Sequence, residues 1–311
     1  MRGVAASSEV AKSLVDKLAK VLLGKRLVVE LAVATFFAEG HLLIEDLPGV
    51  GKTLLARALA KSLGVDFQRV QCTSDLLPAD LLGSEFWDPS TGHIALREGP
   101  VFTNILMADE LNRMPPRTQS ALLECMAEGT VTLGREARRL ADPFFVIATQ
   151  NPVFTAGTYP LPDNQLDRFL LRIGIGYPDR DAELEAVRRE DGHAALDGLA
   201  EVASREEVLA LRAAVENVRL EDELLQWIVD FARRTRQEPD FEVGLSTRGA
   251  QALHRAARAF ALVRGRDYVV PDDLDVLLPY VCGHRVRCHA QDKDPRPRLE
   301  ELRQALPPTR L

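Results

Sequence analysis

The 311-residue sequence has little cysteine, no surplus of positive charge and no long apolar run. Its four cysteines are scattered, which excludes a disulfide framework and favours a reducing compartment. The most apolar early run, residues 27–37, contains Glu30 and is too short to span a bilayer, and residues 1–8 lack the apolar core of a signal peptide. We therefore expect a soluble, cytoplasmic protein with no membrane insertion.

The charge balance argues against one class of partner. The formal net charge is −7, from 39 basic and 46 acidic residues. A mildly acidic chain is not built for general adhesion to nucleic acid, so nucleic acid is not an expected partner. Hydrophobic residues make up 46% of the chain, enough for a substantial core, and the length fits about two domains.

The first part of the chain alternates strand and helix patterns. Apolar runs that are typical of buried parallel strands occur at 41–45, 65–72, 105–108, 144–149 and 170–175. With helical patterns between them, they predict an α/β domain with a parallel sheet over residues 1–178. The stretch 130–140 alternates around Gly134 and predicts a hairpin.

The composition changes after Pro178. Only helical patterns follow, and Ser204 with Glu207 forms a capping box at the start of one of them. We therefore predict an all-helical domain over 179–290. Residues 291–311 are polar and contain four prolines, so we expect a loosely tethered tail.

Residues 44–53 read IEDLPGVGKT, an apolar run followed by a glycine-rich turn and the start of a helix. Glycines let backbone N–H groups close around phosphate oxygens, and the helix N-terminus adds positive dipole character. In such a loop the lysine reaches the β- and γ-phosphates and the threonine hydroxyl binds Mg²⁺. Asp46 stands where the usual pattern has glycine, and a fortuitous Gly-Lys-Thr is the alternative. The predicted nucleotide-binding residues are Pro48, Gly49, Val50, Gly51, Lys52, Thr53 and Leu54.

Asp109 and Glu110 directly follow the apolar run at 105–108. Carboxylates at the C-terminal end of a strand lie where ligands bind in open α/β sheets. Asp109 can hold Mg²⁺, and Glu110 can polarise an attacking water. The alternative is a helix N-cap after a core strand. The phosphate loop upstream makes hydrolysis the better interpretation.

Three more residues are candidates to act on the γ-phosphate. Asn151 ends the next buried strand and could orient the water, or could simply form a turn before a proline. Arg168 could be an arginine finger, whose planar charge suits a phosphoryl transition state, or could pair locally with Asp167. Arg248 opens a helix of the second domain and could reach the nucleotide across the domain crevice, or could be a surface arginine.

Several consecutive segments resemble the MoxR family of AAA+ ATPases. They read GPVF at 99–102, ADELNRMPPRTQSALLE at 108–124, IATQNP at 147–152, GTYPLP at 157–162 and QLDRF at 165–169. Their order and spacing are kept over residues 24–284, which makes the resemblance very specific. It implies a five-stranded parallel sheet of order 5-1-4-3-2 followed by a helical lid.

The resemblance also implies roles for individual residues. Gly49, Gly51, Lys52 and Thr53 correspond to Walker A, Asp109 and Glu110 to Walker B, Asn151 to sensor 1, Arg168 to the arginine finger and Arg248 to sensor 2, with Arg113 as the other candidate finger. Residues 86–100 fall at an insertion in the second helix, and 130–140 at the hairpin before sensor 1. We expect Phe86 and Trp87 to pack against their own domain, although exposed they could contact a substrate protein.

The implied activity is Mg²⁺-dependent ATP hydrolysis in a homo-oligomeric ring, with a hexamer expected. ATP would lie between the α/β domain, the lid and the next subunit, which would supply Arg168 in trans. The family implies chaperone-like remodelling or maturation of client proteins, and partners with a von Willebrand factor A domain. The alternatives are an AAA+ motor acting on nucleic acid and a non-hydrolysing nucleotide-binding scaffold. A GTPase is disfavoured because the sequence has no Asn-Lys-x-Asp motif.

Overall fold

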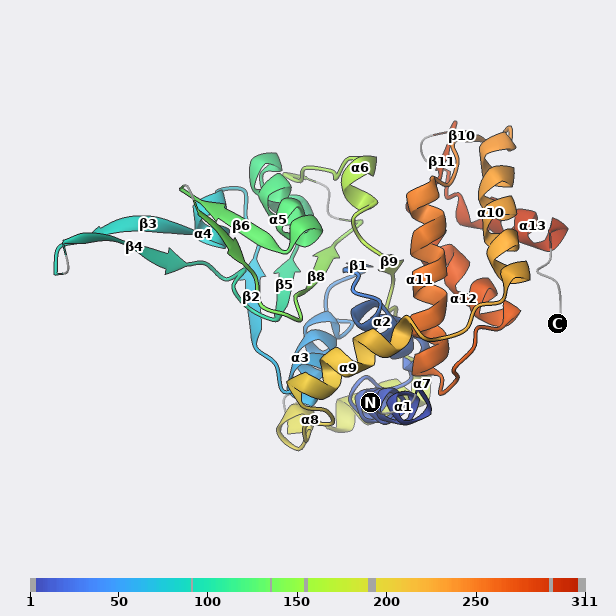
Figure 1. Cartoon of the computed structure of the whole chain (residues 1–311), viewed down its shortest axis with the longest axis horizontal. Helices are drawn as coiled ribbons and strands as arrows, with labels where there is room; N and C mark the ends of the chain where they lie inside the picture. Colours follow the sequence, from blue (N-terminus) through green and yellow to red (C-terminus); the bar gives the residue numbers. More distant parts are fainter. Residues whose placement is uncertain are drawn as a thin grey trace.

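The computed structural model describes residues 4–90, 92–134, 136–153, 156–189, 194–290 and 293–306. The first domain is built on a parallel sheet of five strands with helices on both faces (Figure 1). The strand order is β2-β5-β8-β1-β9, which becomes 5-1-4-3-2 when these strands are numbered along the chain. The sheet order implied by the resemblance is therefore confirmed. The strands are β1 (Leu42–Glu45), β2 (Phe67–Gln71), β5 (Ile105–Asp109), β8 (Phe145–Gln150) and β9 (Leu171–Ile173).

The central strands are buried on both faces, as their apolar runs predict. In β5 and β8 only the last residue is not fully buried. Because successive side chains point to opposite faces, Ile105 and Met107 join one core, and Leu106 and Ala108 join the other. The first core includes α1 (Val4–Val21), α2 (Arg26–Phe37) and α3 (Lys52–Ser62), and the second includes α4 (Pro78–Leu82) and α5 (Pro116–Glu128).

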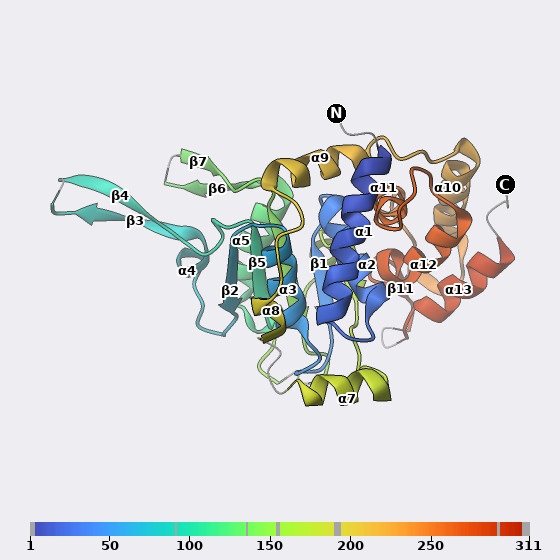
Figure 2. The same ribbon diagram turned by 90° about the horizontal axis from the view of Figure 1, so that it is seen from below.

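Two antiparallel hairpins extend from the sheet domain at one end of the molecule (Figure 2). The predicted hairpin at 130–140 is confirmed as β6 (Thr130–Leu133) and β7 (Glu136–Arg139). Gly134 at its turn has φ +60°, in the left-handed region that favours glycine. The turn's next residue, Arg135, lies outside the described residues.

The insertion expected at 86–100 is also a hairpin, formed by β3 (Gly83–Asp88) and β4 (His93–Glu98). It projects away from the body of the protein (Figure 1). Phe86 and Trp87 are 47% and 62% exposed, so the expectation that they pack against their own domain is wrong. A two-stranded ribbon has no second layer to cover its faces, and this one extends beyond the sheet domain.

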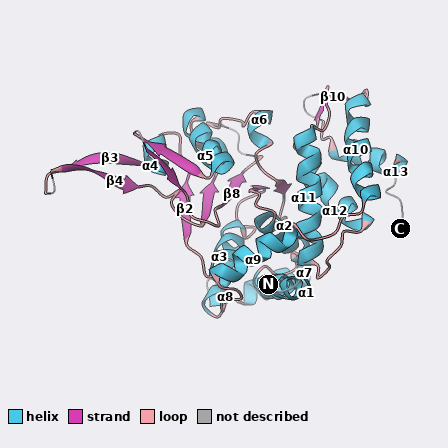
Figure 3. Ribbon diagram, viewed as in Figure 1, coloured by secondary structure: helices cyan, strands magenta, loops and turns pink. Residues whose placement is uncertain are grey.

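The chain after β9 is mainly helical, as predicted, apart from one short ribbon (Figure 3). The predicted capping box is confirmed, since the Ser204 hydroxyl accepts from the Glu207 N–H and the Glu207 carboxylate from the Ser204 N–H. The ribbon pairs β10 (Phe241–Val243) with β11 (Arg287–Cys288). Helix α6 (Asp163–Leu166) precedes β9, and the helices after β9 are α7 (Arg180–Arg188), α8 (Ala194–Asp197), α9 (Arg205–Val215), α10 (Asp222–Gln237), α11 (Thr247–Val263), α12 (Pro271–Cys282) and α13 (Arg296–Ala305).

The loosely tethered tail predicted for 291–311 is wrong over the part that forms α13. Leu299 and Leu302 are buried, and the Trp227 Nε1–H donates to the Leu306 carbonyl oxygen at 2.6 Å. The polar residues of this segment cover the outer side of an amphipathic helix, so its low hydrophobicity hid a packed element. Residues 291, 292 and 307–311 lie outside the described residues.

The lid and the sheet domain share one apolar core. Helix α11 packs along α1 and α2, and α9 also contacts both. Ten of the twelve residues of α2 are buried, including Glu30, whose carboxylate pairs at 3.0 Å with Arg264, the residue that follows α11. None of the helices in the described part of the chain combines the length and the apolar character needed to cross a membrane.

Candidate active site

The phosphate loop joins β1 to α3 at the carboxyl end of the sheet. Gly49 and Gly51 have φ +85° and +98°, which a residue with a side chain rarely adopts. A Cβ on Gly51 would also lie only 2.8 Å from a Leu22 methyl group. The loop therefore brings its backbone to the N-terminus of an eleven-residue helix, the arrangement that binds phosphate.

Lys52 is held inside this loop. Its ammonium donates to the carbonyl oxygens of Asp46 at 2.6 Å and Leu47 at 3.0 Å. Burial lowers the pKa of Lys52, while the carboxylates of Asp46, Asp109 and Glu110 raise it. The cation thus faces the two carboxylates at the carboxyl end of β5, and its hydrogen-bond partners are backbone oxygens.

Asp46, where the usual pattern has glycine, has a structural function that the sequence did not reveal. One carboxylate oxygen accepts from the Leu47 N–H at 2.7 Å. The other accepts from the N–H groups of Ile175 and Gly176, both at 2.6 Å. The carboxylate therefore fastens the start of the phosphate loop to the segment after β9. Only the fold brings these residues together, because they are about 130 positions apart.

Asp109 ends β5, and Glu110 follows it with φ +59°, a left-handed conformation that costs free energy in a non-glycine residue. Thr149 of β8 supports both. Its hydroxyl donates to Asp109 Oδ1 at 2.5 Å and accepts from the Glu110 N–H at 2.9 Å. Glu110 precedes the 3-10 turn η1 (Leu111–Arg113) without a side-chain capping bond, so its carboxylate does not serve as a helix cap.

The two carboxylates have further polar partners from their own chain. Arg69 donates to Asp109 Oδ2 at 2.6 Å, and the Gln71 amide donates to Glu110 Oε2 at 3.1 Å. Arg113, the second candidate finger, pairs with Glu110 at 3.0 Å. Arg69 and Gln71 lie on β2, and no motif in the sequence marks them as neighbours of the acidic pair.

One cavity of about 650 Å³ contains most of the predicted residues. Asn151 lines it, although its side-chain oxygen also accepts from the Val153 N–H at 3.1 Å and so forms the turn given as its alternative. The predicted residues that line the cavity are Pro48, Gly49, Gly51, Lys52, Thr53, Leu54, Asp109, Glu110 and Asn151.

A second, more apolar cavity of about 380 Å³ adjoins the loop and shares Gly49, Gly51 and Leu54 with the first. Val50 lines it, so this predicted residue lies on the apolar side of the loop. Its other walls come from the end of α1 and from the start of the lid, and include Leu22, Leu23, Tyr177, Pro178 and Val187. The sequence offered no motif for these residues, which together can enclose a flat apolar group such as a nucleobase.

Arg168 and Arg248 lie elsewhere. They line a separate cavity of about 490 Å³ together with Arg255, Arg258 and Arg285. Arg248, predicted to reach the nucleotide across the domain crevice, therefore does not line the cavity of its own chain's phosphate loop. The packing of α11 along α1 and α2 sets the first turn of α11 beside the segment between α6 and β9, away from the phosphate loop.

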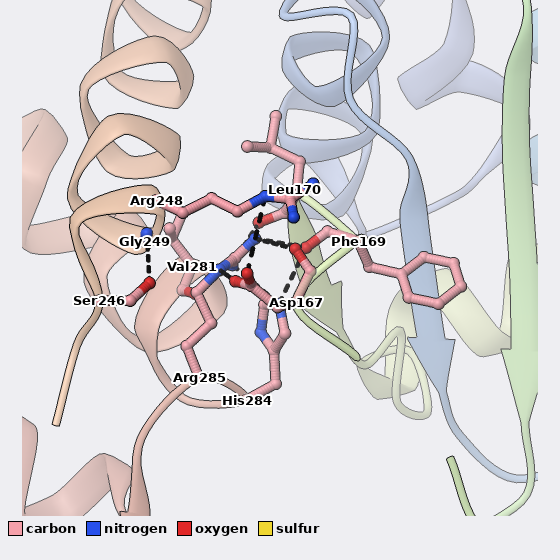
Figure 4. Close-up of polar contacts among 9 residues, drawn as sticks. All are labelled: Asp167, Phe169, Leu170, Ser246, Arg248, Gly249, Val281, His284 and Arg285. Carbon is pink, nitrogen blue, oxygen red and sulfur yellow. Dashed lines mark hydrogen bonds and ion pairs between the residues drawn. The ribbon is translucent and has the colours of Figure 1, made fainter. Parts of the chain in front are cut away.

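Arg168 and Arg248 each have a polar partner in their own chain. Arg168 donates to the Leu123 carbonyl oxygen at 2.6 Å. Among the described residues, no ion pair joins its guanidinium to the Asp167 carboxylate. Asp167 pairs instead with Arg248 at 3.7 Å and with Arg285 at 2.7 Å (Figure 4). The alternative interpretation, a local ion pair between Arg168 and Asp167, is therefore wrong.

These features define a P-loop ATPase of the AAA class, and comparisons with known proteins agree. Residues 41–171 match the family described as "ATPase family associated with various cellular activities (AAA)", and residues 233–306 match the AAA lid domain. A crystal structure of a candidate ATPase from Cytophaga hutchinsonii has a TM-score of 0.90 and 35% sequence identity, and the match covers 99% of this chain and 97% of that one.

Two relatives narrow the class. Chaperone MoxR1 of Mycobacterium tuberculosis is 35% identical over 293 residues, 91% of this chain and 77% of that protein. The uncharacterised protein YeaC of Bacillus subtilis is 47% identical over 279 residues, 90% of this chain and 87% of that protein. The chain belongs to the MoxR family of AAA+ ATPases.

Proposed function

We propose that this protein hydrolyses ATP and uses the energy to remodel other proteins. The observation that carries the proposal is the meeting of Lys52, Thr53, Asp109 and Glu110 around one cavity at the carboxyl end of the sheet. The glycine-rich loop and the start of α3 would hold the phosphates, and Lys52 would exchange its carbonyl partners for phosphate oxygens. The adjoining apolar cavity would take the base.

The same residues fit a magnesium ion. The Thr53 hydroxyl and the Asp109 carboxylate offer the hard oxygen donors that Mg²⁺ prefers, and both line the cavity with the phosphate loop. When bound, the ion would neutralise charge on the phosphates. Thr149 and Arg69 hold the Asp109 carboxylate in place from two sides.

Glu110 is the candidate general base. Its backbone is fixed by Thr149, and its carboxylate is held by Gln71 and Arg113 at the edge of the cavity. A carboxylate so placed can accept a proton from a water that attacks the γ-phosphate, and Asn151 lines the cavity where it could orient that water.

Glu110→Gln tests this function. The variant should bind a fluorescent ATP analogue with unchanged affinity and release phosphate at least about 100-fold more slowly, because a general base typically contributes 10²–10⁴-fold. Glu128→Gln, the same change at an exposed position of α5, is the matched control and should keep wild-type turnover. Wild-type turnover by Glu110→Gln would contradict the assigned role, and lack of turnover by the wild-type protein would contradict the ATPase proposal.

Arg168 and Arg248 would act on the nucleotide of the next subunit. They share a cavity in which five arginines face only two acidic side chains, Asp167 and Glu216, and this cavity is separate from the phosphate loop of the same chain. A cation-rich surface of this kind suits the polyphosphate of a neighbouring copy, and an arginine finger is typically worth ~10³–10⁵ in rate. This division of the site supports assembly of several subunits, and the family resemblance implies a ring of six.

The β3–β4 hairpin supports contact with client proteins. Phe86, Trp87 and Ile94 are exposed on it, and a projecting ribbon with uncovered apolar side chains is suited to bind another polypeptide. One relative is named a chaperone, which agrees with this role. A partner with a von Willebrand factor A domain is part of the proposal through the family resemblance. A cytoplasmic location is part of it through the scattered cysteines, which favour a reducing compartment.

A further inference from the structure

Arg285 lies in the lid between α12 and β11, and its side chain is only 3% exposed. It crosses to the segment between α6 and β9 that carries Arg168 (Figure 4). Its Nε donates to Asp167 Oδ1 at 2.7 Å, and Nη2 donates to the carbonyl oxygens of Asp167 at 3.2 Å and Phe169 at 2.6 Å. Nη1 donates to the Leu170 carbonyl oxygen at 3.0 Å. One guanidinium therefore holds the residues on both sides of Arg168.

The same guanidinium is anchored in the lid. Nη1 donates to the Val281 carbonyl oxygen of α12 at 2.5 Å and lies 2.8 Å from His284 Nε2. His284 Nε2 is also 3.0 Å from the Phe169 carbonyl oxygen. Burial and the nearby Arg285 lower the pKa of His284 well below 6.5, so the imidazole is neutral near pH 7 and adds no second charge.

Asp167 links this buried arginine to an exposed one. Its Oδ1 pairs with Arg285, and its Oδ2 lies 3.7 Å from Nε of Arg248, whose side chain is 63% exposed. The first turn of α11, which carries Arg248, is also fixed at its start. The Ser246 hydroxyl caps this turn by accepting from the Gly249 N–H at 3.0 Å. One carboxylate thus pairs with two of the five arginines that line the cation-rich cavity, Arg248 and Arg285.

We propose that Arg285 is a positioning residue that fixes the Arg168 segment to the lid, so that Arg168 and Arg248 reach the neighbouring subunit's nucleotide as one unit. The inference rests on the proposed function, in which both arginines act in trans. Arg285 lines the cation-rich cavity as well, but its side chain is only 3% exposed and its guanidinium bonds are made to the lid and to the 167–170 segment, so it would act through Arg168 and Arg248. Its function is to set the distance between two cations on different domains.

Arg285→Lys keeps the charge and removes the planar fork. A single ammonium cannot donate in the directions of Asp167, Phe169, Leu170 and Val281 at once. A displacement of the finger by about 1 Å is enough to reduce the rate up to 100-fold, so we expect kcat to fall about tenfold or more. The KM for ATP and the affinity for a fluorescent ATP analogue should stay within about twofold, because the variant's own phosphate loop is intact.

Arg287→Lys is the matched control. Arg287 lies two positions further on and also joins the lid to the sheet domain, by ion pairs with Glu242 at 3.0 Å and Asp163 at 2.6 Å. Its side chain is 44% exposed, and its hydrogen bonds go to Glu242 and Asp163, neither of which belongs to the 167–170 segment. Its replacement should leave the rate within about twofold of wild type, because exposed pairs contribute little.

A mixing experiment separates positioning from a general loss of structure. Arg285→Lys subunits are mixed with excess Glu110→Gln subunits, which cannot turn over but carry an intact Arg168. Each Arg285→Lys site then faces a well-placed finger, and the rate per Arg285→Lys subunit should rise several-fold. Arg168→Ala in the same mixture is the reference for supply in trans, and the oligomer size of every mixture is measured by sedimentation.

The outcomes are distinct. Rescue of both variants supports the proposal. Rescue of Arg168→Ala but not of Arg285→Lys overturns it while leaving supply in trans intact, and so does a wild-type rate for Arg285→Lys. If neither is rescued in assembled rings, supply in trans is wrong and the proposal falls with it. Should Arg285→Lys fail to fold, Asp167→Asn is the second variant. Its amide oxygen can still accept from Arg285, but its NH2 group cannot pair with Arg248, so the variant must show the same loss and rescue.

Discussion

His41, at the start of β1, makes the stability of the sheet domain sensitive to acid. The Val146 N–H of β8 donates to its Nδ1 at 3.0 Å, so Nε2 carries the hydrogen and donates to the Met126 carbonyl oxygen of α5 at 3.0 Å. Burial lowers the pKa of His41 from 6.5 to about 4, and the nearby cations Arg212 and Arg255 act in the same direction. Protonation of Nδ1 would break the bond to Val146 and leave a buried charge.

The sign and size of the effect follow from these two pKa values. Below pH 6.5 the unfolded state takes up a proton on His41, and the folded state does not until about pH 4. Stability that is present above pH 6.5 is therefore lost as the pH falls, and the loss is complete below about pH 4. At 1.36 kcal/mol for each pKa unit, the full loss is roughly 3 kcal/mol, and about 2 kcal/mol of it has occurred at pH 5.0.

His41→Gln tests this prediction, because an amide can replace both hydrogen bonds and cannot take up a proton in this range. The free energy of unfolding is measured by urea titration at pH 7.5 and 5.0, followed by circular dichroism. Wild type should lose about 2 kcal/mol more than the variant between the two pH values. His284, whose pKa is also lowered, is present in both wild type and His41→Gln. It therefore accounts for part of the pH dependence of stability that the variant retains.

His93→Gln, at an exposed position of β4, is the control and should leave the wild-type difference unchanged. An equal difference between the two pH values in wild type and His41→Gln would refute the reasoning. In that case either the imidazole is already protonated in the folded protein, or the strand separates from α5 before the group titrates.

Two further predictions concern the site. Thr149→Val removes the hydroxyl that bridges Asp109 and Glu110, so kcat should fall about 10–100-fold in steady-state phosphate release, as for other groups that orient a metal ligand. Thr149→Ser should stay near wild type, and an unchanged rate for Thr149→Val would contradict the supporting role. Asp46→Asn loses at least one of the three backbone hydrogen bonds that the carboxylate accepts. The free energy of unfolding in urea titrations should therefore fall by about 1–3 kcal/mol, and an ATP analogue should bind more weakly. Unchanged values of both would contradict the link to Ile175.

Much of the sheet domain could be predicted from local sequence. A strand buried on both faces must be apolar throughout, so the runs that became β5 and β8 were visible without any knowledge of their neighbours. The order of the strands was implied only by the family resemblance. The tail prediction was wrong because α13 has two buried leucines among polar residues, and their partners lie in another helix.

The candidate site also has a part that local sequence predicts and a part that it does not. Lys52, Thr53, Asp109 and Glu110 lie in short motifs whose chemistry depends on a strand end or a turn, and the structure brings them together. The long-range contacts of Thr149, Asp46 and Arg285 were not predicted, because the partners are 39 to 130 positions away in the sequence. The position of Arg248 depends on how α11 packs against the first two helices, which no local pattern encodes.

The common core of α1, α2 and α11 means that the chain cannot be cut near Pro178 into two stable pieces. A fragment that ended there would lose α9 and α11, which pack on α2, and would leave apolar side chains of α2 open to water, so it would be prone to aggregate. Exchange of the lid between relatives would require matching changes in the first forty residues. Gene fusions and recombination in this family are therefore expected to preserve both ends of the chain together.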